Sequence, residues 1–128
     1  MNRMAFAYDL RTFAPKGTFS YEGQGWGLTH DGNRLIMSDG TSELRFLDPA
    51  TFAEIGRVTV RDGGREIRDL NELEMVNGRV FANIWFENRI AASRITNFPR
   101  RFDTTLGPRP SPVSSPWPRV LSTLICRC

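Results

Sequence analysis

The chain contains the stretch Tyr8-Asp9-Leu10-Arg11-Thr12-Phe13-Ala14, which returns 39 positions later as Leu47-Asp48-Pro49-Ala50-Thr51-Phe52-Ala53. A second pair, Gly32-Asn33-Arg34-Leu35-Ile36-Met37 and Asn77-Gly78-Arg79-Val80-Phe81-Ala82, is related by a shift of 45 positions. The polar insert Arg61-Asp62-Gly63-Gly64-Arg65-Glu66 accounts for the difference, and we interpret it as a lengthened loop. Repeats of about 40–45 residues with several short strands each are typical of β-propeller blades. The repeat therefore predicts an all-β fold of stacked, antiparallel four-stranded sheets.

The sequence predicts short strands bounded by turn residues, as a blade repeat requires. Asp31-Gly32-Asn33 and Asn77-Gly78 are predicted hairpin turns, because Gly and Asn accept the positive φ that such turns require. Polar and apolar residues alternate in Leu44-Arg45-Phe46-Leu47 and in Arg57-Val58-Thr59-Val60, as expected of strands. No segment has a helical period, so we expect almost no helix and about two blades over residues 1–91. The expected strands are 4–9, 17–21, 26–30, 34–38, 43–48, 54–60, 70–76, 79–85 and 89–95.

The composition changes after residue 91. Residues 1–91 have a net charge of −2, whereas residues 92–128 have six Arg against one Asp and hold six of the eight prolines. The third repeat also ends at Thr96-Asn97-Phe98-Pro99, where the Asp-Pro-x-Thr-Phe pattern is due. We expect residues 92–128 to be a disordered or frameshifted Pro/Arg-rich tail, with a native disordered extension as the alternative. Its arginines lack the clustering that nucleic-acid binding favours, so no nucleic-acid partner is predicted.

Other signals in the chain are weak. Cys126 and Cys128 lack the second pair of ligands that a zinc site needs, so no metal and no cofactor is predicted. No apolar run is long enough to span a membrane, and no membrane partner is expected. No signal peptide is recognised at Met1, and the cellular location stays unknown. Because the chain opens inside the predicted strand Met4–Tyr8, we expect Met1 to be an internal start of a truncated fragment.

Three residues are candidates for a binding site. Trp26 is flanked by glycines in Gly25-Trp26-Gly27-Leu28, which would let a ligand approach the ring closely, although a core tryptophan is the alternative. Asn71 begins a predicted strand and can both donate and accept hydrogen bonds, or it can simply be a turn residue. Trp85 closes a strand at the end where propeller loops line a central funnel. His30, the sole histidine, is expected to be a solvated turn residue.

Over residues 4–91 the chain resembles the glutaminyl-peptide cyclotransferases of plant and bacterial type, which are five-bladed β-propellers. These enzymes convert an N-terminal glutaminyl residue to pyroglutamyl and release ammonia. Several segments carry the resemblance in order and with matching spacing: Gly25-Trp26-Gly27-Leu28-Thr29, Leu35-Ile36-Met37-Ser38-Asp39-Gly40, Leu44-Arg45-Phe46-Leu47-Asp48-Pro49, Leu70-Asn71-Glu72-Leu73-Glu74 and Ala82-Asn83-Ile84-Trp85.

The resemblance implies substrate-binding roles for Trp26, Asn71 and Trp85, and N-terminal glutaminyl peptides or proteins as substrates. It also implies that no catalytic residue is present, because the family's general acid/base glutamate belongs to a segment upstream of Met1. Gln24 stands where family members often carry an acid. We therefore expect an inactive fragment of an aminoacyltransferase, with a complementary fragment as a conceivable partner. The alternative is a non-catalytic propeller-type module that binds peptides.

Overall fold

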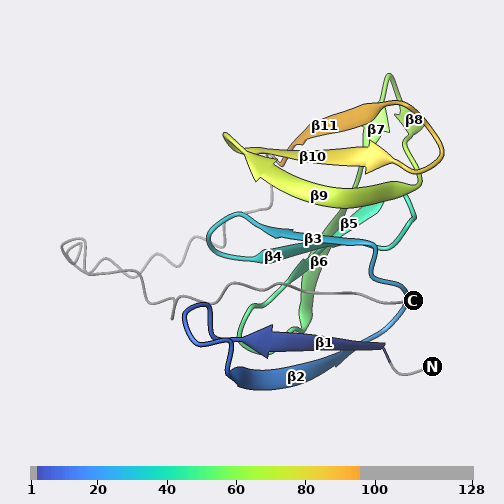
Figure 1. Ribbon diagram of the computed structural model, residues 1–128. Helices are drawn as coiled ribbons and strands as arrows, with labels where there is room; N and C mark the ends of the chain where they lie inside the picture. Colours follow the sequence, from blue (N-terminus) through green and yellow to red (C-terminus); the bar gives the residue numbers. More distant parts are fainter. Residues whose placement is uncertain (1–2, 96–128) are drawn as a thin grey trace, which may run out of the picture.

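The computed structural model describes residues 3–95, and all regular structure in this range is β-strand (Figure 1). The nine longer strands agree with the predicted ranges to within two residues, so the all-β prediction is confirmed. The strands are β1 (Arg3–Tyr8), β2 (Pro15–Tyr21), β3 (Gly27–His30), β4 (Leu35–Ser38), β5 (Glu43–Leu47), β6 (Glu54–Thr59), β7 (Arg61–Asp62), β8 (Arg65–Glu66), β9 (Leu70–Val76), β10 (Arg79–Ile84) and β11 (Ile90–Arg94).

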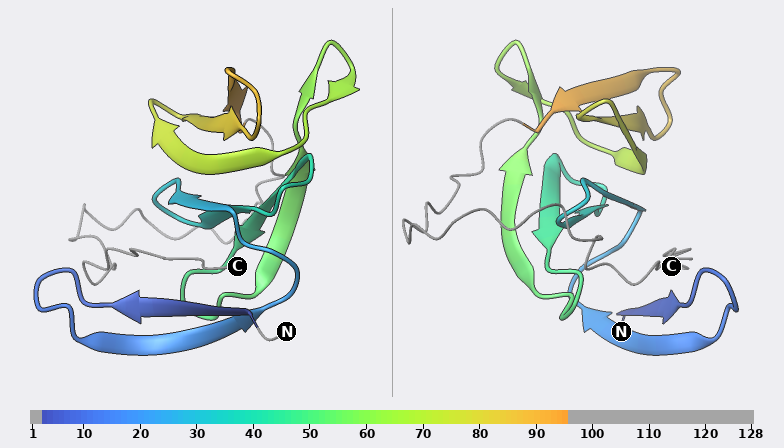
Figure 2. Two further views of the ribbon diagram at one scale, coloured as in Figure 1. Left: turned by 45° about the vertical axis from the view of Figure 1, so that its right-hand side comes forward. Right: turned by 90° about the vertical axis from the view of Figure 1, so that its left-hand side faces the viewer.

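Three antiparallel sheets stack on one another (Figures 1 and 2). The middle sheet has the strand order β3-β4-β5-β6 and is one complete four-stranded blade. The first sheet, β1-β2, corresponds to its last two strands, and the third sheet, β11-β10-β9, corresponds to its first three. The described residues thus form about two blades of a β-propeller, as predicted.

The turn between β1 and β2 is built around one carboxylate. Oδ1 of Asp9 accepts hydrogen bonds from the backbone N–H groups of Arg11 and Thr12, each at 3.0 Å. The Thr12 hydroxyl in turn accepts the N–H of Ala14 at 3.3 Å. Phe13 then adopts a left-handed conformation with φ +56°, and its N–H donates to the Asp9 carbonyl at 2.8 Å. Asp and Thr are needed here because their side chains satisfy backbone donors that the tight turn leaves unpaired.

The turn between β5 and β6 reproduces this arrangement 39 residues later. Oδ1 of Asp48 accepts the N–H groups of Ala50 and Thr51 at 2.8 and 2.9 Å, and the Thr51 hydroxyl accepts the N–H of Ala53 at 3.2 Å. Phe52 has φ +62° and donates its N–H to the Asp48 carbonyl at 2.7 Å. The sequence repeat is therefore a repeat of hydrogen bonding, although Pro49 stands in one copy only.

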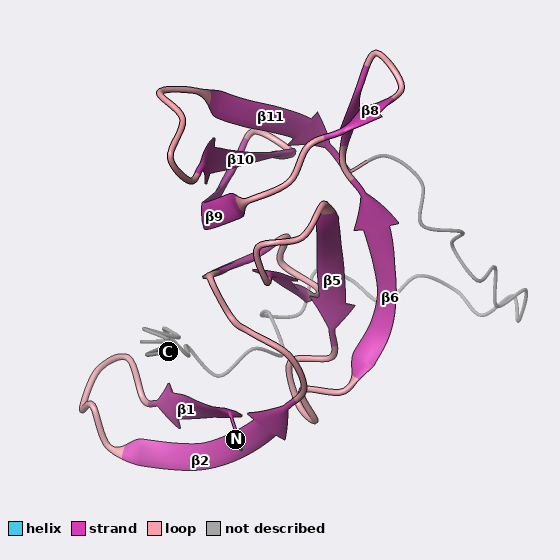
Figure 3. Cartoon of the chain, turned by 90° about the vertical axis from the view of Figure 1, so that its right-hand side faces the viewer, coloured by secondary structure: helices cyan, strands magenta, loops and turns pink. Residues whose placement is uncertain are grey.

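The polar insert differs from its prediction as a loop. Residues 61–66 form a two-stranded hairpin, β7 paired with β8, which projects beyond the sheets (Figure 3). Gly63 and Gly64 form the turn with φ +54° and +83°, values that suit a two-residue hairpin turn and that glycine adopts at little cost. Glu66 anchors the hairpin to the middle sheet, since its Oε2 accepts the Ser42 hydroxyl at 2.9 Å.

The core lies in the two spaces between the stacked sheets. One cluster joins the middle and third sheets, and the other joins the first and middle sheets through Phe52. Both faces of β4 and β5 are covered, so Leu44–Leu47 is buried throughout. The strand is present as predicted, but the alternation of polar and apolar residues does not correspond to exposure, because Arg45 is only 8% exposed. The buried apolar residues of the two clusters are Ile36, Leu44, Phe46, Val60, Leu70, Val80 and Ala82, and Ala5, Met37, Leu47 and Phe52.

Burial of Arg45 is compensated by specific partners. Its Nε donates to Oε2 of Glu54 at 2.8 Å, and its Nη1 donates to the carbonyl of Glu22 at 2.7 Å. Glu22 lies in the segment that leads from β2 to β3, so Arg45 ties the first sheet to the middle one. Glu54 has a lowered pKa: partial burial opposes the shift, but hydrogen bonds from Arg57 and Arg45 outweigh it.

Residues 92–94 belong to β11, in agreement with the strand expected over 89–95. The rest of the expectation for the Pro/Arg-rich tail, together with Cys126 and Cys128, lies outside the described residues. Within residues 3–95, no helix capable of crossing a membrane is found.

Candidate functional site

The three candidate residues come from one end of two neighbouring sheets. Trp26 directly precedes β3, Asn71 is the second residue of β9, and Trp85 directly follows β10. In the middle sheet β3 starts where β4 ends, and in the third sheet β9 starts where β10 ends. Because β3 and β9 lie side by side in the stack, these positions meet (Figure 1). We call this end of the two sheets the site end.

The indole rings of Trp26 and Trp85 contact each other across the two sheets. Their centroids are 6.3 Å apart and their planes form an angle of 68°, an edge-to-face arrangement. Trp26 is half-buried and Trp85 is exposed. The sequence alone did not show this pairing, since 59 positions separate the two residues. The pair forms an aromatic wall at the site end.

A glycine is required at position 27 to admit the neighbouring strand, and not to admit a ligand as predicted. A Cβ at this position would lie 2.8 Å from the backbone nitrogen of Leu73 and 2.9 Å from that of Glu72. Such distances are shorter than real Cβ contacts, so only glycine lets β3 approach the backbone of β9. This glycine accommodates the neighbouring sheet, and the close approach joins the residue after Trp26 to the residue after Asn71.

Trp26 is held in place by its own loop. Its Nε1 donates to Oε1 of Gln24 at 2.7 Å, and its backbone N–H donates to the Ser38 carbonyl at 2.9 Å. One face of the ring covers Gly40, where a Cβ would lie 2.7 Å from Cζ2 of the indole. The indole is therefore fixed in orientation, and Gln24 serves as its hydrogen-bond acceptor.

Asn71 is buried and pairs in register with Asn83 of β10, next to a β-bulge. Oδ1 of Asn83 and Oγ of Ser38 are buried without a hydrogen-bond partner among the described residues. Buried polar atoms are rarely left unpaired, so these two atoms mark an unusual polar stretch of the core next to the site end. The 45-residue repeat could have identified them, because Ser38 and Asn83 occupy the same place in β4 and β10.

Three of the six described non-glycine residues with positive φ lie at the site end. Asp69, Glu72 and Phe86 have φ values of +58°, +44° and +64°, although none of them is glycine. Asp69 also links the sheets, since its N–H donates to the Gly40 carbonyl at 2.9 Å and its carbonyl accepts the N–H of Trp85 at 2.8 Å. Unfavourable backbone conformations persist where the surrounding structure enforces them, often at functional sites.

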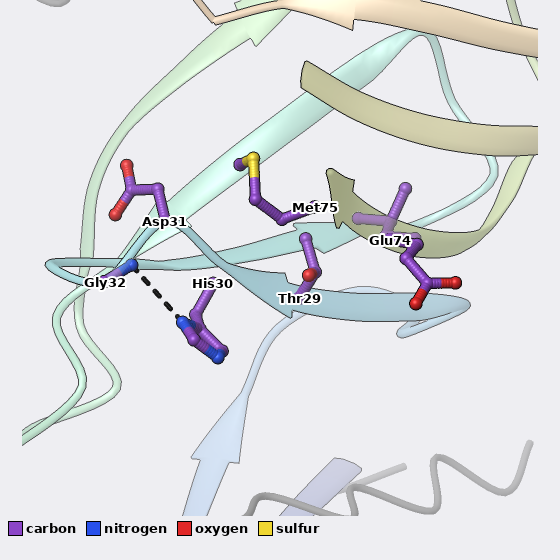
Figure 4. Close-up of a pocket in the computed structure, with 7 residues that line it drawn as sticks. Thr29, His30, Asp31, Gly32, Glu74 and Met75 are labelled. Carbon is purple, nitrogen blue, oxygen red and sulfur yellow. Dashed lines mark hydrogen bonds between the residues drawn. The ribbon is translucent and has the colours of Figure 1, made fainter. Parts of the chain in front are cut away.

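A hollow of about 480 Å³ lies elsewhere, between the far ends of β3 and β9 (Figure 4). None of the three candidate residues lines it.

Nδ1 of His30 accepts the N–H of Gly32 at 3.3 Å, and Asp31 is paired with Arg34 at 2.7 Å, so these polar groups are engaged within the turn. His30 is exposed, as predicted, but it is the last residue of β3 and not part of the turn that follows. In the described part of the chain no cluster of metal-ligating side chains is found. The residues lining the hollow are Thr29, His30, Asp31, Gly32, Leu73, Glu74 and Met75.

Stacked antiparallel sheets, one of which is a complete four-stranded blade, are the architecture of a β-propeller, and the aromatic wall lies at one end of two of these sheets. Comparisons with known proteins identify the family. The family model described as glutamine cyclotransferase matches residues 1–97, and the chain belongs to this family. It is 44% identical over 92 residues to a glutaminyl-peptide cyclotransferase of Arabidopsis thaliana, covering 71% of this chain and 29% of the relative.

A solved structure supports the same family assignment. The crystal structure of Myxococcus xanthus glutaminyl cyclase superposes with a TM-score of 0.61 at 38% identity, covering 62% of this chain and 34% of that chain. The chain therefore spans about a third of the length of the relatives that it matches.

Proposed function

We propose that this chain forms the glutaminyl-binding wall of a glutaminyl-peptide cyclotransferase. The observation that carries the proposal is the contact between Trp26 and Trp85 at the same end of the sheets as the buried Asn71, in a member of this family. The substrate is the N-terminal glutaminyl residue of a peptide or protein. Its α-amine attacks the side-chain carboxamide carbon, the C–N bond to the amide nitrogen breaks, and ammonia leaves as the pyroglutamyl ring closes.

Each residue has a role that its surroundings suit. The flat faces of Trp26 and Trp85 would pack against the aliphatic part of the glutaminyl side chain and fold it toward its own amine, which supplies proximity. Asn71 can donate to the substrate carbonyl and accept from its amide or amine. Because Asn71 is buried, such hydrogen bonds would form in a low local dielectric and orient the substrate strongly.

Proton transfer is the step that these residues do not supply. The reaction needs a group that removes a proton from the amine and delivers one to the departing ammonia. The resemblance to the family assigns this group to a glutamate outside this sequence. Loss of a general acid/base costs on the order of 10²–10⁴ in rate. We therefore expect the 128-residue chain to bind glutaminyl peptides without measurable turnover.

Calorimetric titration of the chain with Gln-Ala amide tests the proposal. The Trp26→Ala and Asn71→Ala variants are expected to bind at least about tenfold more weakly, equivalent to about 1.4 kcal/mol. His30→Ala is the control, because His30 lies away from the site end, and it is expected to bind like the unmodified chain. Equal affinity for Gln-Ala and pyroglutamyl-Ala amides would contradict the proposed site. Ammonia release by the chain would show that it is an enzyme as it stands.

A further inference from the structure

Phe86 is the most exposed large hydrophobic residue among those that the structure describes. Its side chain is 94% exposed, although it directly follows Trp85 of the proposed site. Single exposed apolar residues are common on protein surfaces, so exposure alone does not indicate a function. Three further observations distinguish Phe86.

The first is its backbone conformation. Residues Ile84–Glu87 form a turn in which the N–H of Glu87 donates to the Ile84 carbonyl at 3.0 Å, and Phe86 is the third residue with φ +64°. A positive φ at this place is typical of a type II turn, which favours glycine or asparagine there. The corresponding loop between β4 and β5 has a glycine, Gly40, at its positive φ, one position earlier in the 45-residue repeat than Phe86. A bulky aromatic residue thus stands where the backbone favours a glycine.

The second observation is that the loop is well anchored. The N–H of Ile84 donates to the Arg89 carbonyl at 3.1 Å, and Nε of Arg89 donates to Oε2 of Glu87 at 2.6 Å. The two charged side chains of the loop therefore neutralise each other. The ring of Phe86 is the most exposed apolar group that this loop offers to a ligand.

The third observation is the continuity of the aromatic wall. The Phe86 ring lies 5.3 Å from Trp85 with an interplanar angle of 71°, and Trp85 contacts Trp26 in a similar edge-to-face manner. The three rings form a row that leads from half-buried Trp26 to solvent-exposed Phe86. A peptide whose first residue lies against the two tryptophans would continue toward the outer end of this row.

We propose that Phe86 binds the side chain of the second residue of the substrate and favours peptides with an apolar or aromatic residue after the N-terminal glutamine. This inference rests on the proposed function of the site. Aromatic rings pair favourably with other aromatic and apolar side chains in addition to the area they bury. Consecutive Cα atoms are about 3.8 Å apart, so the second residue reaches a ring adjacent to Trp85.

Titration of the chain with Gln-Phe-Ala amide and Gln-Gly-Ala amide tests the inference. The unmodified chain is expected to bind the Phe peptide about threefold to tenfold more tightly than the Gly peptide. In Phe86→Gly this preference is expected to disappear through weaker binding of the Phe peptide, with the affinity for the Gly peptide unchanged. Glycine suits the positive φ, so the variant keeps the turn, and Phe86→Asn gives a second deletion of the ring that tolerates the same backbone.

Phe13 provides a matched control. It is also an exposed phenylalanine at positive φ, 67% exposed with φ +56°, but its turn lies at the opposite end of the sheets. Phe13→Gly is expected to leave both affinities and the preference unchanged. Equal binding of the two peptides by the unmodified chain would overturn the role of Phe86 and leave the proposed function intact. Failure to bind either peptide would overturn both.

Discussion

Phe52 and Phe13 occupy the same position in two copies of one turn, yet Phe52 is 5% exposed and Phe13 is 67% exposed. Phe52 lies against the first sheet, where its ring stacks on Phe19 at 5.4 Å and contacts Tyr21 at 5.8 Å. To be buried in the same way, Phe13 would need a strand equivalent to β2 on the far side of the first sheet. The repeated phenylalanine therefore acts as a contact between successive sheets, and only one of the two contacts is formed within residues 3–95.

Replacing Phe52 with alanine is expected to destabilise the fold strongly, by about 3–5 kcal/mol, because it removes a buried ring and leaves a cavity between two sheets. Phe13→Ala is the matched control, with an expected change within about 0.5 kcal/mol. Both positions have a positive φ, so the backbone cost of alanine is common to both variants. Urea denaturation followed by circular dichroism measures the difference, and equal midpoints for the two variants would refute the contact.

Gly40→Ala is expected to weaken binding of Gln-Ala amide by about tenfold or more, because a Cβ would push into the ring of Trp26. Gly32→Ala separates this effect from backbone strain. Gly32 has a similar φ of +91°, but no atom lies within 4 Å of its added Cβ. We expect Gly32→Ala to lower the stability without changing the affinity. If both variants bind equally well, the orientation of Trp26 is not what the site requires.

Arg45→Ala is expected to cost about 3–5 kcal/mol, because it leaves Glu54 without one of its cations and the Glu22 carbonyl without its donor. Arg57 also pairs with Glu54, at 2.7 Å, but half of its side chain is exposed. Arg57→Ala is therefore expected to cost at most about 1 kcal/mol. Thermal and urea unfolding of the two variants measures the contrast, which would be absent if burial of Arg45 were unimportant.

Acid is expected to destabilise the fold through Asp31. Burial tends to raise the pKa of this carboxyl, but hydrogen bonds from the N–H of Asn33 and from Arg34 outweigh it, so the folded-state pKa is lowered. A lowered folded-state pKa gives stability that is present above the unfolded value of about 4 and is lost as the pH falls through the folded value.

Asp31→Asn should therefore be less stable than the unmodified chain at pH 7, and the difference should shrink toward pH 3. Unfolding free energies measured at several pH values between these limits test this expectation. A constant difference between the two proteins over that range would show that the ionised Asp31 side chain does not contribute.

The positions of the strands were predictable because the signals for them are local. A carboxylate followed three residues later by threonine satisfies the donors of its own turn, and this chemistry acts within six residues at Asp9 and again at Asp48. Glycine and asparagine at Asn77-Gly78 likewise mark a hairpin turn, with observed φ values of +49° and +75°. The polar insert with Gly63 and Gly64 predicts only a lengthened loop, because strands of two residues each are too short to show a strand pattern.

The candidate site was only partly predictable. Trp26, Asn71 and Trp85 were selected from the sequence, but the contact between the two indoles and the buried atoms of Ser38 and Asn83 were not. Phe86 was not predictable as a site residue, because a phenylalanine in the sequence does not indicate a positive φ. Burial of Arg45 was missed for a similar reason, since alternation along one strand does not reveal that a second sheet covers its other face.

The sequence by itself thus determined the strands, the turns and the repeat that relates successive sheets, because each depends on residues within one turn or one strand. Only the tertiary structure decided which residues meet at the site end. The stacking of sheets brings together residues 45 to 59 positions apart, and the close approach that Gly27 permits sets how near they lie.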